Sequence, residues 1–174
     1  MMIDNPNQLK ASAEFTQTII SLLSTGRGVH AETAISAASR IAGTFALRSC
    51  GLPMSQFSPG TPILGDVIDE QGNKVLATVN DTLAGLNVEL NSSNYELPED
   101  NTPHMQLAEV QSMLDAPFRA IVDKYHLSEE EGAHAAAVSA AVLIEKASSC
   151  LDPNIGYTVA VYGMVEACKT VPIA

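Results

Sequence analysis

The stretch GRGVHAET, residues 26–33, is the one short run in this sequence that combines several residue types suited to chemistry. It sets an arginine between two glycines, and then a histidine and a glutamate one residue apart. A histidine beside a carboxylate can transfer protons, and glycines with an arginine just before a helix can cradle an anion. Arg27, His30 and Glu32 are therefore the candidate ligand-binding residues.

A His-Ala-Glu run at the start of a helix resembles the zinc motif of nucleoside and base deaminases. In that motif the histidine binds zinc and the glutamate moves protons for the zinc-bound water. The same chemistry needs a downstream Pro-Cys-x-x-Cys to complete the metal shell, on an α/β scaffold. The corresponding region reads MSQFSPGTPIL and contains neither cysteine nor histidine. The resemblance covers three residues and fails at the metal ligands, so we reject it and expect no metal or cofactor.

An anion-binding loop is also weakly supported, because the phosphate-loop pattern GxxxxGK[ST] is absent and Glu32 would oppose an anion. The simpler interpretation is structural. Gly26 ends one helix, Gly28 turns the chain, His30 lies near the start of the next helix, and Glu32 favours the helix dipole. No catalytic residue is assigned, and the sequence leaves open whether the protein is an enzyme.

The other histidines, His104, His126 and His134, form no pair at a spacing of four residues. A helical metal site would have to be assembled from distant segments. His104 beside a Thr-Pro pair and His126 at a predicted helix end are typical of capping or surface positions. His134 follows three glutamates, and we expect these carboxylates to raise its pKa.

Three cysteines, Cys50, Cys150 and Cys168, lie far apart and include no CxxC pair. An odd number without metal spacing favours reduced, mostly buried thiols in the cytoplasm. A disulfide between Cys50 and Cys150 stays open as an alternative.

The net charge of the chain makes some classes of binding partner unfavourable. The chain has 9 Lys+Arg against 20 Asp+Glu, a formal net charge of -11, which opposes attraction to nucleic acid or to an anionic bilayer. No window of about 18 residues is continuously apolar, and the start MMIDNPNQLK lacks the basic and apolar regions of an export signal. We expect a cytoplasmic protein with neither nucleic acid nor membrane as its partner.

Helix signals recur along the chain, from Asn-Pro and Asp-Pro caps to a Ser-x-x-Glu capping box. Loops are expected near 51–62 and 91–102, and Pro117 should kink or restart its helix near Asp115. The run YTVAVY is assigned to a helix in preference to a strand. The predicted helices cover about 6–24, 30–49, 73–90, 103–125, 129–150 and 153–169, with a short helical turn over 63–68.

These elements predict an all-α, single-domain bundle of about six helices that spans residues 1–174. The residues are 46% hydrophobic but only 5% aromatic, and alanine is dense in the second and fifth helices. Such helices stabilise a fold when their backbones approach closely, which favours two central helices and a symmetric dimer. The stretches GVHAETAISAASRIAGTFALRSC and GAHAAAVSAAVLIEKASSC are weakly similar, so a duplicated helical hairpin is conceivable.

The leading functional hypothesis is a protein that acts by protein–protein interaction, as a homodimer, an adaptor or a chaperone. Apolar side chains in the proline-rich loop, Leu52, Met54 and Phe57, need cover from a partner or from the core. The alternative is an enzyme or a ligand-binding or metal-binding bundle whose site surrounds Arg27, His30 and Glu32.

Overall fold

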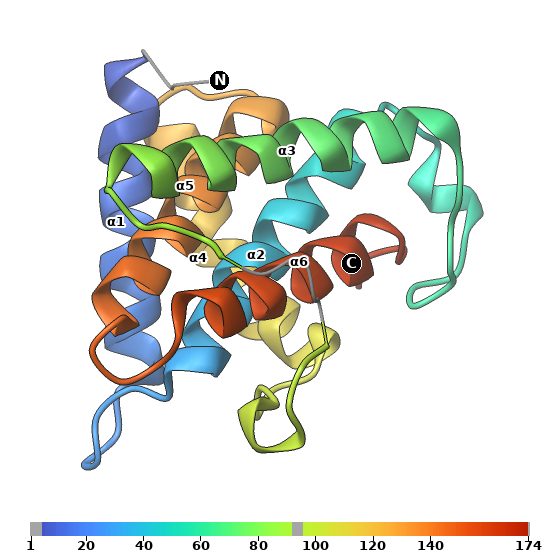
Figure 1. Ribbon diagram of the computed structural model, residues 1–174. Coiled ribbons are helices and arrows are strands. Elements are labelled where there is room, and N and C mark those ends of the chain that lie inside the picture. The colour runs from blue at the N-terminus through green and yellow to red at the C-terminus, as the bar shows by residue number, and fades with distance from the viewer. Residues whose placement is uncertain (1–4, 92–95, 174) are drawn as a thin grey trace.

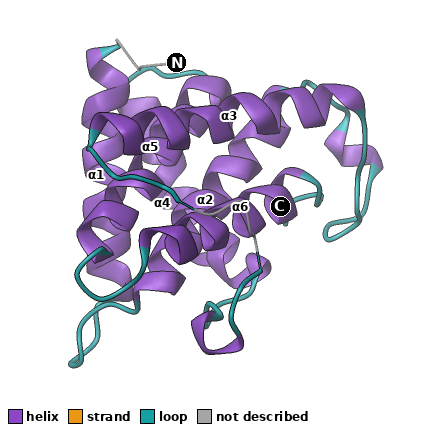
Figure 2. Ribbon diagram, viewed as in Figure 1, coloured by secondary structure: helices purple, strands orange, loops and turns teal. Residues whose placement is uncertain are grey.

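Residues 5–91 and 96–173 are described by the computed structural model of the chain. In these ranges the chain forms six α-helices and no strand (Figure 1; Figure 2). The helices are α1 (Pro6–Leu23), α2 (Ala31–Ser49), α3 (Asp66–Gly85), α4 (Leu107–Lys124), α5 (Glu129–Ala147) and α6 (Pro153–Cys168). The prediction of an all-α bundle of about six helices is confirmed. The expectations for residues 1–4, and for 92–95 in the predicted loop 91–102, lie outside the described residues.

Helices α2 and α5 form the centre of the bundle, and α3 and α6 cross in front of them in Figure 1. Every residue from Glu32 to Leu47 of α2 is buried, as is every residue from Gly132 to Ala141 of α5. Most of these side chains are small, so neighbouring backbones approach closely. The predicted central role of the two alanine-rich helices is confirmed, and their small faces are covered within a single chain.

The crossing of α2 and α6 depends on two glycines. A Cβ atom added to Gly43 would lie 2.5 Å from the carbonyl oxygen of Met164, and one added to Gly163 would lie 2.5 Å from Ser39 Oγ. Real Cβ atoms do not approach other atoms so closely. The absent side chains therefore let these two helices pack at their observed separation.

Three of the predicted helix starts are confirmed by their caps. The Asn5 side chain accepts a hydrogen bond from the amide of Asn7, and Asp152 does the same for the start of α6. Ser128 and Glu131 form the reciprocal capping box that opens α5.

The predicted bounds of α3, 73–90, are wrong at both ends. The helix begins at Asp66 and absorbs the separate turn expected over 63–68, because Asp66 and Asp69 place negative charge in the first turn. It ends at Gly85 because Asn87 adopts φ +58°, and the Val88 N–H then bonds back to the oxygen of Leu83.

Helix α4 also differs from expectation. It begins at Leu107, where Gln106 and Glu109 form a capping box, and the Thr-Pro cap expected at residues 102–103 lies in the preceding loop. The helix runs through Pro117 without the predicted restart. A proline removes one backbone hydrogen bond, and the remaining bonds, with the Asp115 carboxylate held by Arg48 and Arg119, keep the helix continuous.

The proline-rich loop after α2 folds back onto the core. It contains a short 3-10 helix, Met54–Gln56, and Leu52 and Met54 pack against the core while Phe57 stays 40% exposed. The core thus covers two of the three apolar side chains that needed cover. Among the described residues, no helix has the length and apolarity needed to cross a bilayer.

The two weakly similar stretches form α2 and α5, each preceded by another helix. Their histidines nevertheless occupy different positions, because His30 is the N-cap of α2, whereas His134 lies inside α5. The structure therefore contains two helical hairpins, and the matched letters do not occupy equivalent positions in them.

Candidate functional site

The turn between α1 and α2 holds Arg27 at its tip. Thr25 and Gly28 pair as a short antiparallel bridge, with N···O distances of 2.9 and 3.0 Å. Gly28 has φ +97°, a conformation that glycine adopts without strain. The prediction that Gly28 turns the chain is confirmed. The prediction that Gly26 ends the helix is wrong, because α1 already ends at Leu23.

His30 caps α2 with its ring. Its Nδ1 accepts the backbone N–H of Thr33 at 3.3 Å and lies 2.8 Å from Thr33 Oγ1. Its Nε2 lies 3.3 Å from Glu32 Oε2. Since Nδ1 accepts, we infer that the proton of neutral His30 resides on Nε2 and faces Glu32. Both ring nitrogens are therefore engaged.

Glu32 lies behind His30. Its side chain is 11% exposed, and its Oε1 accepts a 2.7 Å hydrogen bond from Asn101 Nδ2. The carboxylate thus has a partner on each oxygen. It orients His30 and ties the loop before α4 to the start of α2.

His104 comes from that same loop and completes the site. Its backbone N–H donates to Thr33 Oγ1 at 2.9 Å, and its ring stacks on His30 with centroids 3.7 Å apart and planes 17° from parallel. Arg40 of α2 holds the next residue, because its guanidinium bonds both the Met105 carbonyl oxygen and Glu166. None of the described residues hydrogen-bonds the ring nitrogens of His104.

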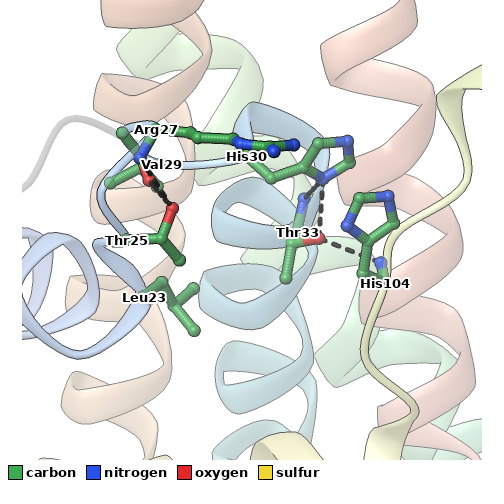
Figure 3. A pocket seen from close by; sticks show the side chains of 8 residues that line it. Leu23, Thr25, Arg27, Val29, His30, Thr33 and His104 are labelled. Atoms are coloured by element: carbon green, nitrogen blue, oxygen red, sulfur yellow. Dashed lines mark hydrogen bonds between the residues drawn. The ribbon is translucent and has the colours of Figure 1, made fainter.

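A pocket of about 440 Å³ opens where these groups meet (Figure 3). In Figure 3 the Arg27 side chain extends along the turn toward His30. The ring of His104 lies next to the ring of His30. Glu32 is not part of the wall. The residues that line the pocket are Leu23, Thr25, Arg27, Gly28, Val29, His30, Thr33 and His104.

The wall of this pocket can donate hydrogen bonds to an anion. The Arg27 guanidinium carries N–H donors and a positive charge, and the exposed His104 ring carries an N–H donor. Leu23 and Val29 supply apolar surface beside these donors. The arrangement suits binding better than catalysis, because both nitrogens of His30 are already committed.

Metal coordination has less support from the geometry. Among the described residues, no three His, Cys, Asp or Glu side chains gather in a way that could hold a metal ion. The lone pairs of imidazole lie in the ring plane, so two stacked rings such as His30 and His104 do not direct them at a common point.

Comparisons of the chain with models of known protein families, with curated proteins and with solved structures find no match.

Of the three candidates selected from the sequence, Arg27 and His30 both line this pocket, and His104 lines it as well although the sequence did not suggest it. Glu32 contacts the same cluster from behind. The sequence around His104 reads NTPHMQ and shows no sign of contact with the α1–α2 turn. The tertiary fold alone brings the two segments together.

The remaining histidines lie elsewhere. His126 is exposed after α4 with φ +53°. His134 is 4% exposed, and its Nδ1 lies 2.7 Å from Thr78 Oγ1. Burial lowers the pKa of His134, and this outweighs the opposing effect of Glu130. The expectation of a raised pKa is therefore wrong, because desolvation of the imidazolium is the larger effect.

All three thiols are free, so the alternative of a disulfide between Cys50 and Cys150 is not realised. Cys168 is buried, and burial raises the pKa of its thiol to about 11. Burial also raises the pKa of Cys50. Cys150 is exposed, so the expectation of mostly buried thiols holds for part of the set.

Proposed function

We propose that the protein binds a small organic anion in the pocket between the α1–α2 turn and His104. The observation that supports this most is the convergence of Arg27, His30 and His104, from two distant segments, on one pocket of about 440 Å³. That volume is within the range of small-molecule sites.

The local charge also supports an anion. The chain carries a net charge of -11, yet none of the described residues that line this pocket is acidic. Glu32 pairs with His30 from behind, so the Arg27 guanidinium provides the charge that faces the ligand. The exposed ring of His104 offers polar nitrogens beside it.

Calorimetric titration with butyrate and with inorganic phosphate tests the proposal. Removing a charged hydrogen-bond donor costs roughly 1.5–3 kcal/mol, so Arg27→Ala should weaken binding about tenfold or more. His104→Ala, which removes the ring beside Arg27, should also weaken binding. His126→Asn and Lys10→Ala, which change an exposed imidazole and an exposed cation far from the pocket, should bind like the original protein.

Two results would contradict the proposal. One is that neither anion binds at millimolar concentration. The other is that Arg27→Ala and His104→Ala bind anions as tightly as the two control variants.

A homodimer is the second candidate, and exposed apolar side chains at one end of the molecule favour it. Leu64 is 77% exposed, and Val67 and Val165 are each 45% exposed. The Ile63 N–H donates to the Lys169 carbonyl oxygen at 2.9 Å, which holds the start of α3 against the end of α6. A second copy would remove these side chains from water.

Light scattering coupled to size-exclusion chromatography tests the dimer. At a protein concentration of about 100 µM we expect the molar mass of a dimer. The double variant Leu64→Lys with Val165→Lys should have the molar mass of a monomer. Leu22→Lys changes a side chain that is 47% exposed on α1 and should leave the mass unchanged. A monomer at that concentration in the original protein would contradict this candidate.

A cytoplasmic location completes the proposal. The three free thiols support it, because a reducing compartment preserves them. The strongly acidic charge supports partners other than nucleic acid.

A further inference from the structure

We propose that the anion is amphipathic, a straight-chain carboxylate whose head lies at Arg27 and His104 and whose alkyl chain passes Val29 into a second pocket. This inference rests on the proposed function, because it names the class of ligand for the same site.

The second pocket lies on the other side of Val29. Its volume is about 230 Å³, and its wall comes from α1, the start of α2 and the end of α5. Val29 lines both pockets. The residues that line the second pocket are Ile20, Val29, Ala31, Ala34, Leu143, Lys146, Ala147 and Cys150.

Apolar side chains line both pockets where they share Val29. Ile20 and Leu23 lie one turn apart on α1 and so share a face of that helix. Ile20 lines the second pocket and Leu23 the first. Val29 lines both pockets, and all three side chains are partly exposed. An alkyl chain that follows these side chains would bury apolar surface that water now contacts.

The polarity of the two pockets differs along the same path. The first pocket carries the arginine and the two imidazoles. The second is lined by aliphatic side chains, with the exposed Lys146 and Cys150 as exceptions. Among the residues that the structure describes, no acidic residue lines either pocket, although the chain contains 20 Asp+Glu. A charged head joined to an apolar tail matches this change of polarity, whereas a compact anion such as phosphate leaves the second pocket without a ligand group.

Titration with butyrate, hexanoate and octanoate, each below its micelle concentration, tests the inference. Burial of a methylene group contributes roughly 0.8 kcal/mol, so affinity should rise up to about fourfold for each added methylene. 1-Hexanol, which has a tail but no charge, should bind much more weakly than hexanoate.

Variants separate the two pockets. Ala147→Phe places a ring in the second pocket, so it should remove the gain from hexanoate and octanoate while leaving butyrate affinity unchanged. Leu9→Ala is the matched control for unspecific binding, because it removes an apolar side chain that is 49% exposed near the start of α1, at the opposite end of that helix from Ile20 and Leu23. It should retain the full dependence on chain length. A thermal melt of each variant confirms that the variant folds.

The outcomes distinguish the two proposals. If butyrate binds through Arg27 and affinity does not increase with chain length, this inference fails and the proposed function stands. The inference also fails if Ala147→Phe retains the full dependence on chain length. If 1-hexanol binds as tightly as hexanoate, or if no carboxylate binds, the proposed function fails together with this inference.

Discussion

His30 serves both as the cap of α2 and as a wall of the pocket. Its Nδ1 accepts the Thr33 amide, and its ring stacks on His104. Loss of an N-cap acceptor typically costs about 1 kcal/mol of stability. A substitution that keeps the cap but removes the ring therefore separates the two roles of His30.

We expect His30→Ala to lower the free energy of unfolding by about 1 kcal/mol, while His30→Asn retains most of it because asparagine caps helices well. Both variants lose the ring that faces the ligand, so both should bind anions more weakly. Urea unfolding and calorimetry measure the two effects. Equal destabilisation by the two substitutions would show that the ring stabilises the fold by packing and not by capping.

The sequence singled out three of the four side chains that the structure brings together here. Arg27, His30 and Glu32 could be selected because they cluster within six residues and because glycines mark the turn. His104 could not, since its contact with His30 is set by the packing of the loop before α4 on the start of α2. Local pattern contains no information about that packing.

His134 should make stability depend on pH. Its pKa in the folded chain is below the ordinary value of 6.5, chiefly because of burial. The unfolded chain therefore takes up the proton first as the pH falls. The contribution of neutral His134 to stability is complete above about pH 6.5, and it is lost as the pH falls from there through the lower folded pKa.

Urea unfolding at pH 7.5, 6.5 and 5.5 tests this expectation. The free energy of unfolding should fall less with acidification in His134→Gln than in the original protein. His126→Asn changes an exposed histidine and should keep the original dependence. If the free energy of unfolding of His134→Gln depends on pH as strongly as that of the original protein, groups other than His134 cause the dependence.

At the scale of helices, the close approach of α2 and α6 gives a sharp prediction. In Gly43→Ala the new methyl would meet the Met164 carbonyl oxygen at 2.5 Å and the Ala167 Cβ at 2.9 Å. Overpacking of this kind typically costs about 1–3 kcal/mol. We therefore expect the free energy of unfolding to fall by about that amount.

Gly85→Ala is the matched control, because Gly85 lies at the end of α3 with no atom within 4 Å of the added Cβ. Alanine favours a helix over glycine by up to about 1 kcal/mol, so this variant should be neutral or slightly more stable. Chemical denaturation of both variants decides the matter. A Gly43→Ala protein as stable as Gly85→Ala would mean that the two helices separate at little cost.

The helices that sequence reasoning placed well are those whose ends are fixed locally. Ser128 and Asp152 bond to amides within three residues, so the residue types alone identify those starts. The bounds of α3 depend on longer contacts. Gly72 of α3 packs closely on α6, since a Cβ atom added to it would lie 3.4 Å from Cys168 Sγ. The end of α3 depends on the left-handed conformation of Asn87. The spacing of apolar residues in the sequence indicates neither the packing of Gly72 on α6 nor the conformation of Asn87.

At the scale of the whole molecule, the three thiols report on opening of the fold. Cys150 is exposed and should react with a thiol reagent within minutes at pH 8. Cys168 is buried and its pKa is about 11, so roughly one molecule in a thousand carries its thiolate at that pH. We expect Cys168 to react at the rate of global opening.

A time course of thiol labelling, read by mass spectrometry of peptides, tests this. Cys150→Ser should remove the fast phase and leave the slow phase unchanged. Rapid labelling of Cys168 in folded protein would show that α3 and α6 separate without global unfolding.

The stacked imidazoles come from opposite sides of a long loop of chain, and Asn101, Thr33 and Arg40 provide the bonds that close it. A partly folded chain that has formed the α1–α2 turn alone has only part of the pocket wall. The proposed anion would therefore bind only after the region before α4 has docked on α2. Such an anion should raise the melting temperature with the logarithm of its concentration once that concentration exceeds its dissociation constant.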